Sequence, residues 1–131
     1  MVALPAKEPN LARKTDTIVL AYTTDTNGYL QSCGCAGGQV GGLARRATRM
    51  QQLRDESERR DQGFVFVDGG NLSDNVNKTE AVLESLSLMR CASTVYGSQE
   101  ERLGTELIPS LEKWHVPIVR LLGDTDVKTD S

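Results

Sequence analysis

Two cysteines separated by a single glycine, Cys33-Gly34-Cys35, are the residues whose spacing most directly suggests chemistry in this 131-residue chain. A disulfide across one residue is strained and redox-labile, so a redox role would use the pair as reactive thiols. A structural zinc or iron–sulfur site needs about four ligands, so a metal here would need carboxylates as well. The carboxylates that could supply them are Asp25, Asp68 and Glu100. Cys33, Cys35 and Asp25 are therefore the candidate metal ligands.

A glycine-rich stretch follows the cysteines and leads into a predicted helix, as a phosphate-binding loop would. It lacks both the Gly-x-Gly-x-x-Gly spacing and the Gly-Lys-Ser/Thr ending of the known phosphate loops. Arginines in the first turns of the helix oppose its dipole, and a bound anion would relieve that conflict. The candidate anion site comprises Gly41, Gly42, Arg45 and Arg46, with Arg49 one turn further on. The alternative is that these arginines are solvated or pair with Asp55 and Glu56.

No complete catalytic set can be assembled from the sequence. The single histidine, His115, and the third cysteine, Cys91, both come just before predicted strands, on the opposite edge of the predicted sheet from the polar loops. A Cys-His or Ser-His pair needs its histidine beside the nucleophile. Asp25 and Asp68 could act as acid and base by position, but carboxylates at strand ends also cap helices. We therefore expect no enzyme activity and no cofactor.

The composition limits the classes of protein to which the chain can belong. Fifteen Lys and Arg residues against 18 Asp and Glu give a net charge of −3, and 38% of residues are hydrophobic. A mildly acidic chain is not suited to coating nucleic acid or an anionic membrane. No apolar run approaches the roughly 20 residues of a membrane span, and none near Met1 suits a signal peptide. We expect a cytoplasmic protein with no nucleic-acid binding and no membrane insertion.

Apolar patterns alternate between the strand and helix types along the chain. Short runs rich in β-branched residues predict strands over 17–23, 64–67, 94–96 and 116–122, and the first run, which does not alternate, predicts burial on both faces. Helical spacing predicts a helix from Leu43 to about Asp61. A second helix is predicted from Asn77, which would form a capping box with Glu80. Leu107, Ile108, Leu111 and Trp114 predict a third helix.

This alternation predicts a single α/β domain over residues 17–124, between an arm at 1–16 and a tail at 125–131. The predicted architecture is a mostly parallel four-stranded sheet with about three crossover helices, in the order β-α-β-α-β-α-β. Its strand-to-helix loops all lie at the carboxyl edge of the sheet, where open α/β sheets bind ligands. The polar residues in these loops are Asp25, Asn27, Cys33, Cys35, Asp68, Asn71, Ser98, Gln99, Glu100 and Asp124.

Four stretches, in order, resemble the motifs of metallophosphoesterases of the 5′-nucleotidase type. The stretch 22–30 (YTTDTNGYL) is similar to His-Thr-Asn-Asp-x-His-Gly-x-Leu, and 41–46 (GGLARR) to Gly-Gly-x-Ala-Arg. The stretch 67–72 (VDGGNL) is similar to Asp-Ala-Gly-Asp between apolar residues, and 97–100 (GSQE) to Gly-Asn-His-Glu. The Cys-Gly-Cys insert resembles that of a bacterial subgroup, which carries it before Gly-Gly-Leu-x-Arg-Arg.

The resemblance implies a hydrolytic centre that has been lost. The family holds two metal ions with the Asp and His of the first motif, a bridging Asp and the Asn of Gly-Asn-His-Glu, and the catalytic His follows that Asn. Of these, the chain retains Asp25 alone. The other positions hold Asn27, Asn71, Ser98 and Gln99. Neutral amides remove most of the charge that holds a dinuclear site.

The family fold is a two-sheet sandwich flanked by helices, and this chain matches only its first half. An exposed apolar face or open strand edge is therefore expected, and such surfaces favour a partner. The leading hypothesis is a non-catalytic accessory or structural subunit of a larger assembly, including a peripheral position on a membrane-bound complex, or a self-associating protein. The alternatives are a redox or metal-binding protein using Cys33 and Cys35, and a residual phosphate- or nucleotide-binding domain or weak phosphoesterase.

Overall fold

The computed structural model describes residues 16–32 and 41–120. The predicted arm (except Asp16), the predicted tail, and the cysteines at 33 and 35 lie outside these ranges. The strands form one parallel sheet in the order β1-β2-β3-β4, which confirms the predicted α/β class. Their bounds are β1 (Ile18–Thr23), β2 (Gly63–Asp68), β3 (Ser93–Tyr96) and β4 (Ile118–Arg120).

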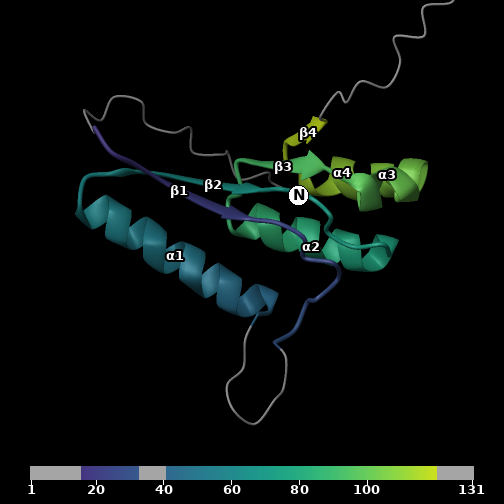
Figure 1. Cartoon of the computed structure of the whole chain (residues 1–131), viewed down its shortest axis with the longest axis horizontal. Helices are drawn as coiled ribbons and strands as arrows, with labels where there is room; N and C mark the ends of the chain where they lie inside the picture. The colour runs from purple at the N-terminus through teal and green to yellow at the C-terminus, as the bar shows by residue number, and fades with distance from the viewer. Residues whose placement is uncertain (1–15, 33–40, 121–131) are drawn as a thin grey trace, which may run out of the picture.

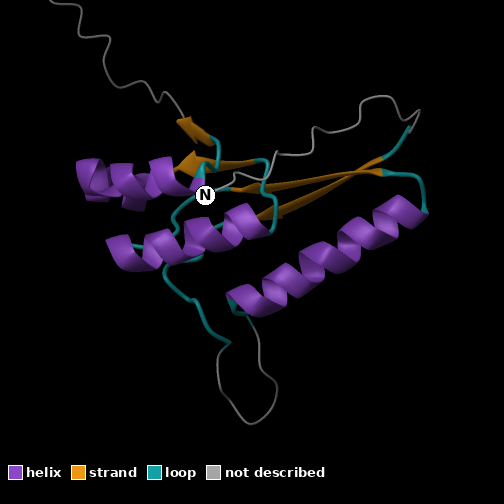
Figure 2. Ribbon diagram, turned by 180° about the vertical axis from the view of Figure 1, so that it is seen from behind, coloured by secondary structure: helices purple, strands orange, loops and turns teal. Residues whose placement is uncertain are grey.

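The described helices all cover one face of this sheet. Helix α1 (Leu43–Arg59) connects β1 to β2, and α2 (Val76–Leu88) connects β2 to β3. The last connection contains α3 (Ser98–Leu103), a 3₁₀ turn η1 (Gly104–Leu107) and α4 (Ile108–Trp114). Consecutive strands are neighbours in the sheet, and parallel crossovers are right-handed, so every connection passes on the same side. Figures 1 and 2 show the result from its two sides: a sheet with helices behind it, then the same helices in front.

Two helix starts differ from the sequence-based predictions. The side chain of Asn75, rather than Asn77, caps α2, because its Oδ1 accepts a hydrogen bond of 3.1 Å from the backbone N–H of Lys78. Glu80, the predicted capping-box partner, instead pairs with Lys113 of α4 at 2.8 Å. The segment 97–100 was predicted as a loop, but α3 begins there at Ser98. The described helices do not include one with the length and apolar character needed to cross a membrane.

The core lies between the sheet and α2. Its most deeply buried apolar side chains, each exposed by 1% or less, are Phe66, Leu72, Val82, Leu83, Leu86 and Leu107. Helix α1 contributes mainly Met50 to the same cluster. Cys91 is also part of it.

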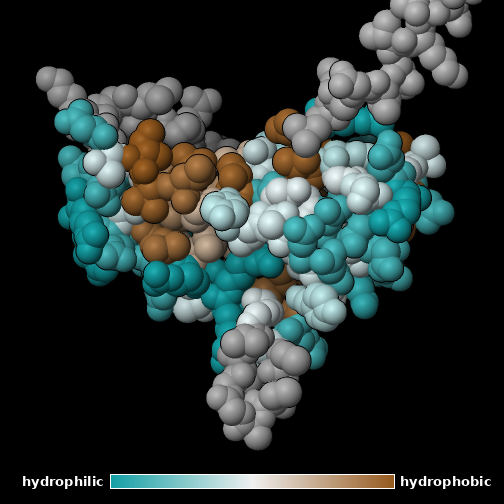
Figure 3. Space-filling view, viewed as in Figure 1, coloured by the Kyte–Doolittle hydropathy of each residue, from teal (hydrophilic) through white to brown (hydrophobic). Residues whose placement is uncertain are grey.

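The opposite face of the sheet is apolar and is not covered by any element in the described ranges. The prediction that the first strand is buried on both faces is wrong: Ile18 is 67% exposed, Leu20 62% and Tyr22 74%. The strand register places half-buried valines of β2 beside them, and further valines continue the face across β3 and β4. We call this surface the open sheet face; it comprises Ile18, Leu20, Tyr22, Val65, Val67, Val95 and Val119. Figure 3 shows it as a hydrophobic patch on the side away from the helices.

Candidate functional site at the carboxyl edge of the sheet

The loops that follow β1 and β2 are joined by their backbones. Three N–H groups of the first loop donate to three carbonyls of the second: Asp25 to Gly70 at 3.0 Å, Asn27 to Asn71 at 3.0 Å, and Gly28 to Leu72 at 2.7 Å. These bonds satisfy polar groups that a loop lying over a core would otherwise leave unpaired. They also fix the side chains of two distant chain segments next to each other.

The segment after β3 is attached to these loops by a buried carboxylate. Glu100 is only 2% exposed, and its side chain accepts three backbone N–H groups. The donors are Leu72 at 2.6 Å, Gly97 at 2.8 Å and Asn71 at 3.0 Å. Hydrogen bonds to an ionised acceptor are stronger than those between neutral groups. Glu100 therefore positions the start of α3 against the end of β2.

A glycine makes the closest approach between these segments possible. Gly70 has φ of +84°, and a Cβ added there would lie 2.4 Å from the carbonyl oxygen of Val95. That distance is well inside van der Waals contact, so any side chain at position 70 would force β2 and β3 apart at this edge. The close approach of the two strands therefore explains the glycine at position 70, independently of the family resemblance.

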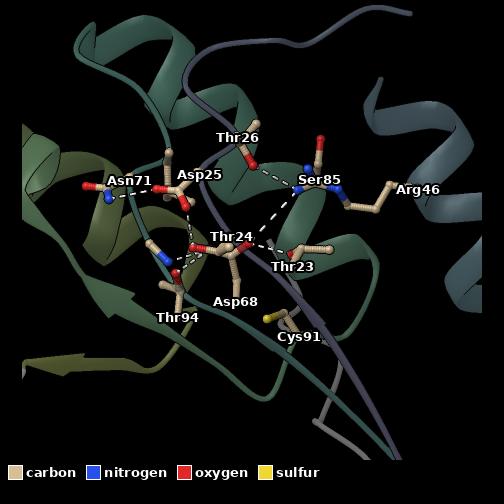
Figure 4. Close-up of polar contacts among 12 residues, drawn as sticks. Thr23, Thr24, Asp25, Thr26, Arg46, Asp68, Asn71, Ser85, Cys91 and Thr94 are labelled. Atoms are coloured by element: carbon tan, nitrogen blue, oxygen red, sulfur yellow. Dashed lines mark hydrogen bonds and ion pairs between the residues drawn. The ribbon is translucent and has the colours of Figure 1, made fainter. Parts of the chain in front are cut away.

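Asp68 lies beneath the loops and is 2% exposed. Thr23 and Thr94, which are its register neighbours on β1 and β3, donate their hydroxyls to it at 2.6 and 3.1 Å, and the N–H of Gly70 donates at 2.8 Å. The guanidinium of Arg46 lies 4.0 Å away. Figure 4 shows these groups converging on the carboxylate. Its lone pairs are therefore occupied within the protein, and Asp68 is not positioned as a solvent-facing base or metal ligand.

Arg46 behaves differently from the prediction made for the arginines of α1. Its Nη1 donates to the hydroxyl of Thr26 at 2.9 Å, and its side chain is 19% exposed. The predicted alternative pairing with Asp55 or Glu56 is wrong for Arg46, because its ionic partner is Asp68. Asp55 accepts from Gln51, and Glu56 pairs with Arg60.

Above Asp68, hydrogen bonds link five polar residues, and we call them the amide network: Asp25, Asn27, Asn71, Ser98 and Gln99. The Nδ2 of Asn71 donates to Asp25 at 2.9 Å, and the Oδ1 of Asn71 accepts from the hydroxyl of Ser98 at 3.2 Å and the backbone of Gln99 at 3.3 Å. The Nε2 of Gln99 donates to Asn27 at 2.7 Å. The structure thus brings together the five positions at which the sequence was compared with a metal centre.

Three members of the amide network have left-handed backbone conformations. Asp25 has φ of 53°, Asn27 of 49° and Asn71 of 56°. Asn and Asp adopt this region more readily than other residues with side chains. The residue types therefore suit the loop shape, independently of any chemistry.

The described residues do not contain a group of three or more His, Cys, Asp and Glu side chains placed to hold a metal ion. Within the amide network, Asp25 is the single carboxylate, and its Oδ1 and Oδ2 accept from Asn71 and Thr24. The other two candidate metal ligands, the cysteines at 33 and 35, lie outside the described residues. The network has hydrogen-bonding capacity but, in this part of the chain, no nucleophile–base pair.

The candidate anion site is divided by the structure. Gly41, Gly42 and Arg45 line a cavity of about 290 Å³ together with Leu30, Gln31, Ser32 and Ala44. Arg46 is directed away from this cavity, toward Thr26 and Asp68. The four predicted residues therefore do not form one site.

The expected placement of Cys91 at the far edge of the sheet is wrong. Strand β3 pairs with only the last two residues of β2, Val67 and Asp68, so β3 begins where β2 ends. This stagger brings the thiol beneath Asp68, as Figure 4 shows. Burial raises the pKa of Cys91 to about 12, and the neighbouring Asp68 carboxylate acts in the same direction. His115 ends α4 in a left-handed conformation.

Sequence reasoning missed two elements of the site: the Arg46–Thr26–Asp68 contact and the anchoring role of Glu100. A glutamate three residues after Gly97 is a helix-start signal and could have indicated the start of α3. The sequence offered no comparable signal for Arg46, because its partners are 20 or more positions away. Comparison with known proteins found neither a matching family model nor a matching curated protein.

Proposed function

We propose that this protein is a non-catalytic protein-binding subunit, of metallophosphoesterase ancestry, which docks a partner chain on its open sheet face. The observation that carries the proposal is the exposure of Ile18, Leu20 and Tyr22, each more than half accessible, on a parallel sheet. Parallel sheets occur almost only where both faces are covered. A partner that covers this face would complete the second layer of the fold.

The energetic argument follows from the apolar character of the face. Burying apolar surface stabilises a complex by roughly 25 cal/mol per Å², so about 400 Å² would contribute on the order of 10 kcal/mol before the costs of association. Large exposed apolar patches are typical of surfaces that bind another protein. Stability should rise in the presence of the partner, because binding the folded form shifts the folding equilibrium.

The amide network supports the non-catalytic part of the proposal. Asn71 and Gln99 direct their amides at neighbouring side chains, and Asp25 accepts from Asn71. Amides are neutral at all ordinary pH values, so they neither exchange protons with a substrate nor balance the charge of a metal pair. In this proposal the amide network holds three loops together at the carboxyl edge of the sheet and has no catalytic role.

The test uses the full chain, tagged and returned to its own cells. Val119→Lys combined with Val67→Thr adds a charge and a hydroxyl to the open sheet face, whereas Leu88→Lys alters a leucine of α2 that is 77% exposed and lies on the other side of the sheet. We expect the face variant to lose both its partner and most of its binding of a hydrophobic-surface dye. The Leu88 variant should retain both.

Two results would contradict the proposal. Equal partner recovery and dye binding by the face variant and the Leu88 control would show that the open sheet face does not bind. Turnover of a phosphate ester with manganese, zinc or cobalt, at about 1 per second or more and abolished by Asp25→Ala, would show an enzyme.

A further inference from the structure

The outer edge of β1 is a second surface, distinct from the open sheet face. In the described sheet, β1 pairs with β2 and has no strand on its other side. The carbonyls of Thr17 and Thr23 accept from the N–H groups of Gly63 and Gly69 at 3.1 and 2.7 Å, so odd-numbered residues of β1 direct their backbone groups inward, toward β2. By alternation, Ile18, Leu20 and Tyr22 direct their N–H and C=O groups outward.

Strand β1 itself carries none of the sequence features that usually prevent edge strands from pairing between molecules. Such features are charged side chains, proline, bulges and very short strands. Strand β1 is six residues long and reads Ile-Val-Leu-Ala-Tyr-Thr, without charge, glycine or proline. The other edge strand of the described sheet, β4, carries the charged side chain of Arg120. Within the described residues the two edge strands therefore differ: β4 carries a charge and β1 does not.

The sequence of β1 is also complementary to itself when read in the opposite direction. If two copies pair antiparallel about a two-fold axis at Leu20, each leucine faces the other. Ile18 then faces Tyr22 of the second copy, and Val19 faces Ala21. Pairs of aromatic and β-branched residues are favourable across antiparallel strands, and the two-fold axis makes the Ile18–Tyr22 contact occur twice. The outward-directed residues, at 18, 20 and 22, become the hydrogen-bonded pairs of this register.

We propose that the β1 edge binds the β1 edge of a second copy of this chain, forming a continuous eight-stranded sheet. Main-chain hydrogen bonds supply affinity in such strand addition, and alternate side chains supply register. A two-fold axis perpendicular to the sheet keeps both open sheet faces on the same side, where they form one wider surface. The inference concerns the edge and goes beyond the proposed function, which concerns the face.

Cysteine cross-linking tests the register directly. The experiment uses the full chain with Cys33→Ser and Cys35→Ser, and compares Leu20→Cys with Ile18→Cys. Directly opposite residues of a hydrogen-bonded pair have Cα atoms about 5.5 Å apart, within disulfide range. In the proposed register the two copies of position 20 are opposite, whereas those of position 18 are four residues out of register, about 13 Å. Oxidised glutathione accepts the two electrons released as two thiols form the disulfide.

We expect Leu20→Cys to give a covalent dimer at least tenfold faster than Ile18→Cys. Equal rates, or a faster reaction at position 18, would overturn the proposal, as would sedimentation of the unaltered chain as a monomer at tens of micromolar. The unaltered chain would also sediment as a monomer if this edge pairs with a strand of a different protein, and that result overturns the proposal as well. The face variant of the preceding section leaves the β1 sequence unchanged, so the failure of one proposal is distinguishable from the failure of the other.

A charge-pair experiment checks the same register without cysteines. Ile18→Lys alone, or Tyr22→Lys added to it, should weaken dimerisation at least tenfold by sedimentation. Ile18→Lys combined with Tyr22→Glu should restore it, because each introduced ammonium then faces an introduced carboxylate in the other copy. Within one chain these positions are about 13 Å apart, so they do not pair with each other. Failure of the combined variant to recover dimerisation, in a chain that stays folded, would overturn the register.

Discussion

Asn71 donates a hydrogen bond of 2.9 Å from its Nδ2 to the Oδ1 of Asp25, across 46 residues of sequence. This bond joins the loop after β1 to the loop after β2 at the point where the family resemblance would place two metal ligands. An amide and a carboxylate attract, whereas two carboxylates at this separation repel unless a cation lies between them. With an amide at position 71, the contact with Asp25 is attractive and needs no cation between the two side chains.

Asn71→Asp should destabilise the protein by about 1–3 kcal/mol, because it removes a donor and places two carboxylates side by side. The unfolding free energy from urea titration measures the loss. Asp25→Asn in the same chain restores one amide facing one carboxylate, so the double variant should recover most of the stability. An unchanged stability in the single variant would mean that the bond does not hold the two loops together.

Gly70→Ala should be far more destabilising than Gly41→Ala, although both glycines have positive φ. The left-handed conformation costs a residue with a side chain about 1–2 kcal/mol at either position. The added methyl group meets the Val95 carbonyl at 2.4 Å at position 70, but at position 41 it meets no atom of the described residues within 4 Å. We expect a difference of about 2 kcal/mol or more in the unfolding free energy. Equal losses would contradict the close approach of β2 and β3.

Substitution of Arg46 and substitution of Arg49, both on α1, should differ in their effect on the free energy of unfolding. Arg46→Gln removes the bond to Thr26 and the nearest cation of the buried Asp68, and should cost about 1–3 kcal/mol. Arg49→Gln changes an exposed residue of the same helix and should stay within about 0.5 kcal/mol. Thermal unfolding of the two variants, compared with the unaltered chain, measures both. Similar losses would place Arg46 on the solvent-facing side of α1.

The strand order and helix positions could be predicted because they follow from local patterns: short β-branched runs and apolar stripes at helical spacing. The exposure of β1 could not, because a run such as 17–23 looks the same whether one face or both are covered. What decides between them is that consecutive strands are neighbours, which places every described helix on one side. That is a property of the whole sheet, and it is not contained in any single segment.

The positions of the candidate-site residues could be predicted from local sequence patterns, but the contacts between them could not. These residues could be located from their positions after strands, since parallel strands bring such loops to one edge. Their pairing could not be predicted, because Asn71 contacts Asp25 and Gln99 contacts Asn27 through loop conformations with positive φ. The stagger of β3, which moves Cys91 beneath Asp68, likewise depends on tertiary packing.

Cys91 should contribute a pH dependence to stability in alkaline solution. Its pKa is raised from 9.0 to about 12 by burial, so above pH 9 the thiol ionises in the unfolded chain but not in the folded one. Below pH 9 the thiol is protonated in both states, and the free energy of unfolding keeps its full value. As the pH rises from 9 toward 12, ionisation of the unfolded chain lowers that free energy. The difference in unfolding free energy between the unaltered chain and Cys91→Ala should therefore shrink over this range. A difference that stays constant from pH 9 to pH 11.5 would contradict it.

The proposed metallophosphoesterase ancestry predicts that a metal site can be built at the amide network. The variant combines Asn27→His, Asn71→Asp, Ser98→Asn and Gln99→His and keeps Asp25. Side-chain hydrogen bonds already join Gln99 to Asn27, Asn71 to Asp25 and Ser98 to Asn71, and the backbone N–H of Gln99 joins it to Asn71, so the new ligands would lie close together. Imidazole and carboxylate ligands suit zinc and manganese. Calorimetric titration should show stoichiometric zinc binding, with a rise in the unfolding temperature that grows with metal concentration. Adding Asp25→Ala should abolish both effects, while the unaltered chain should show neither. A folded variant that binds no metal would remove the support for matching these positions to the family's metal ligands.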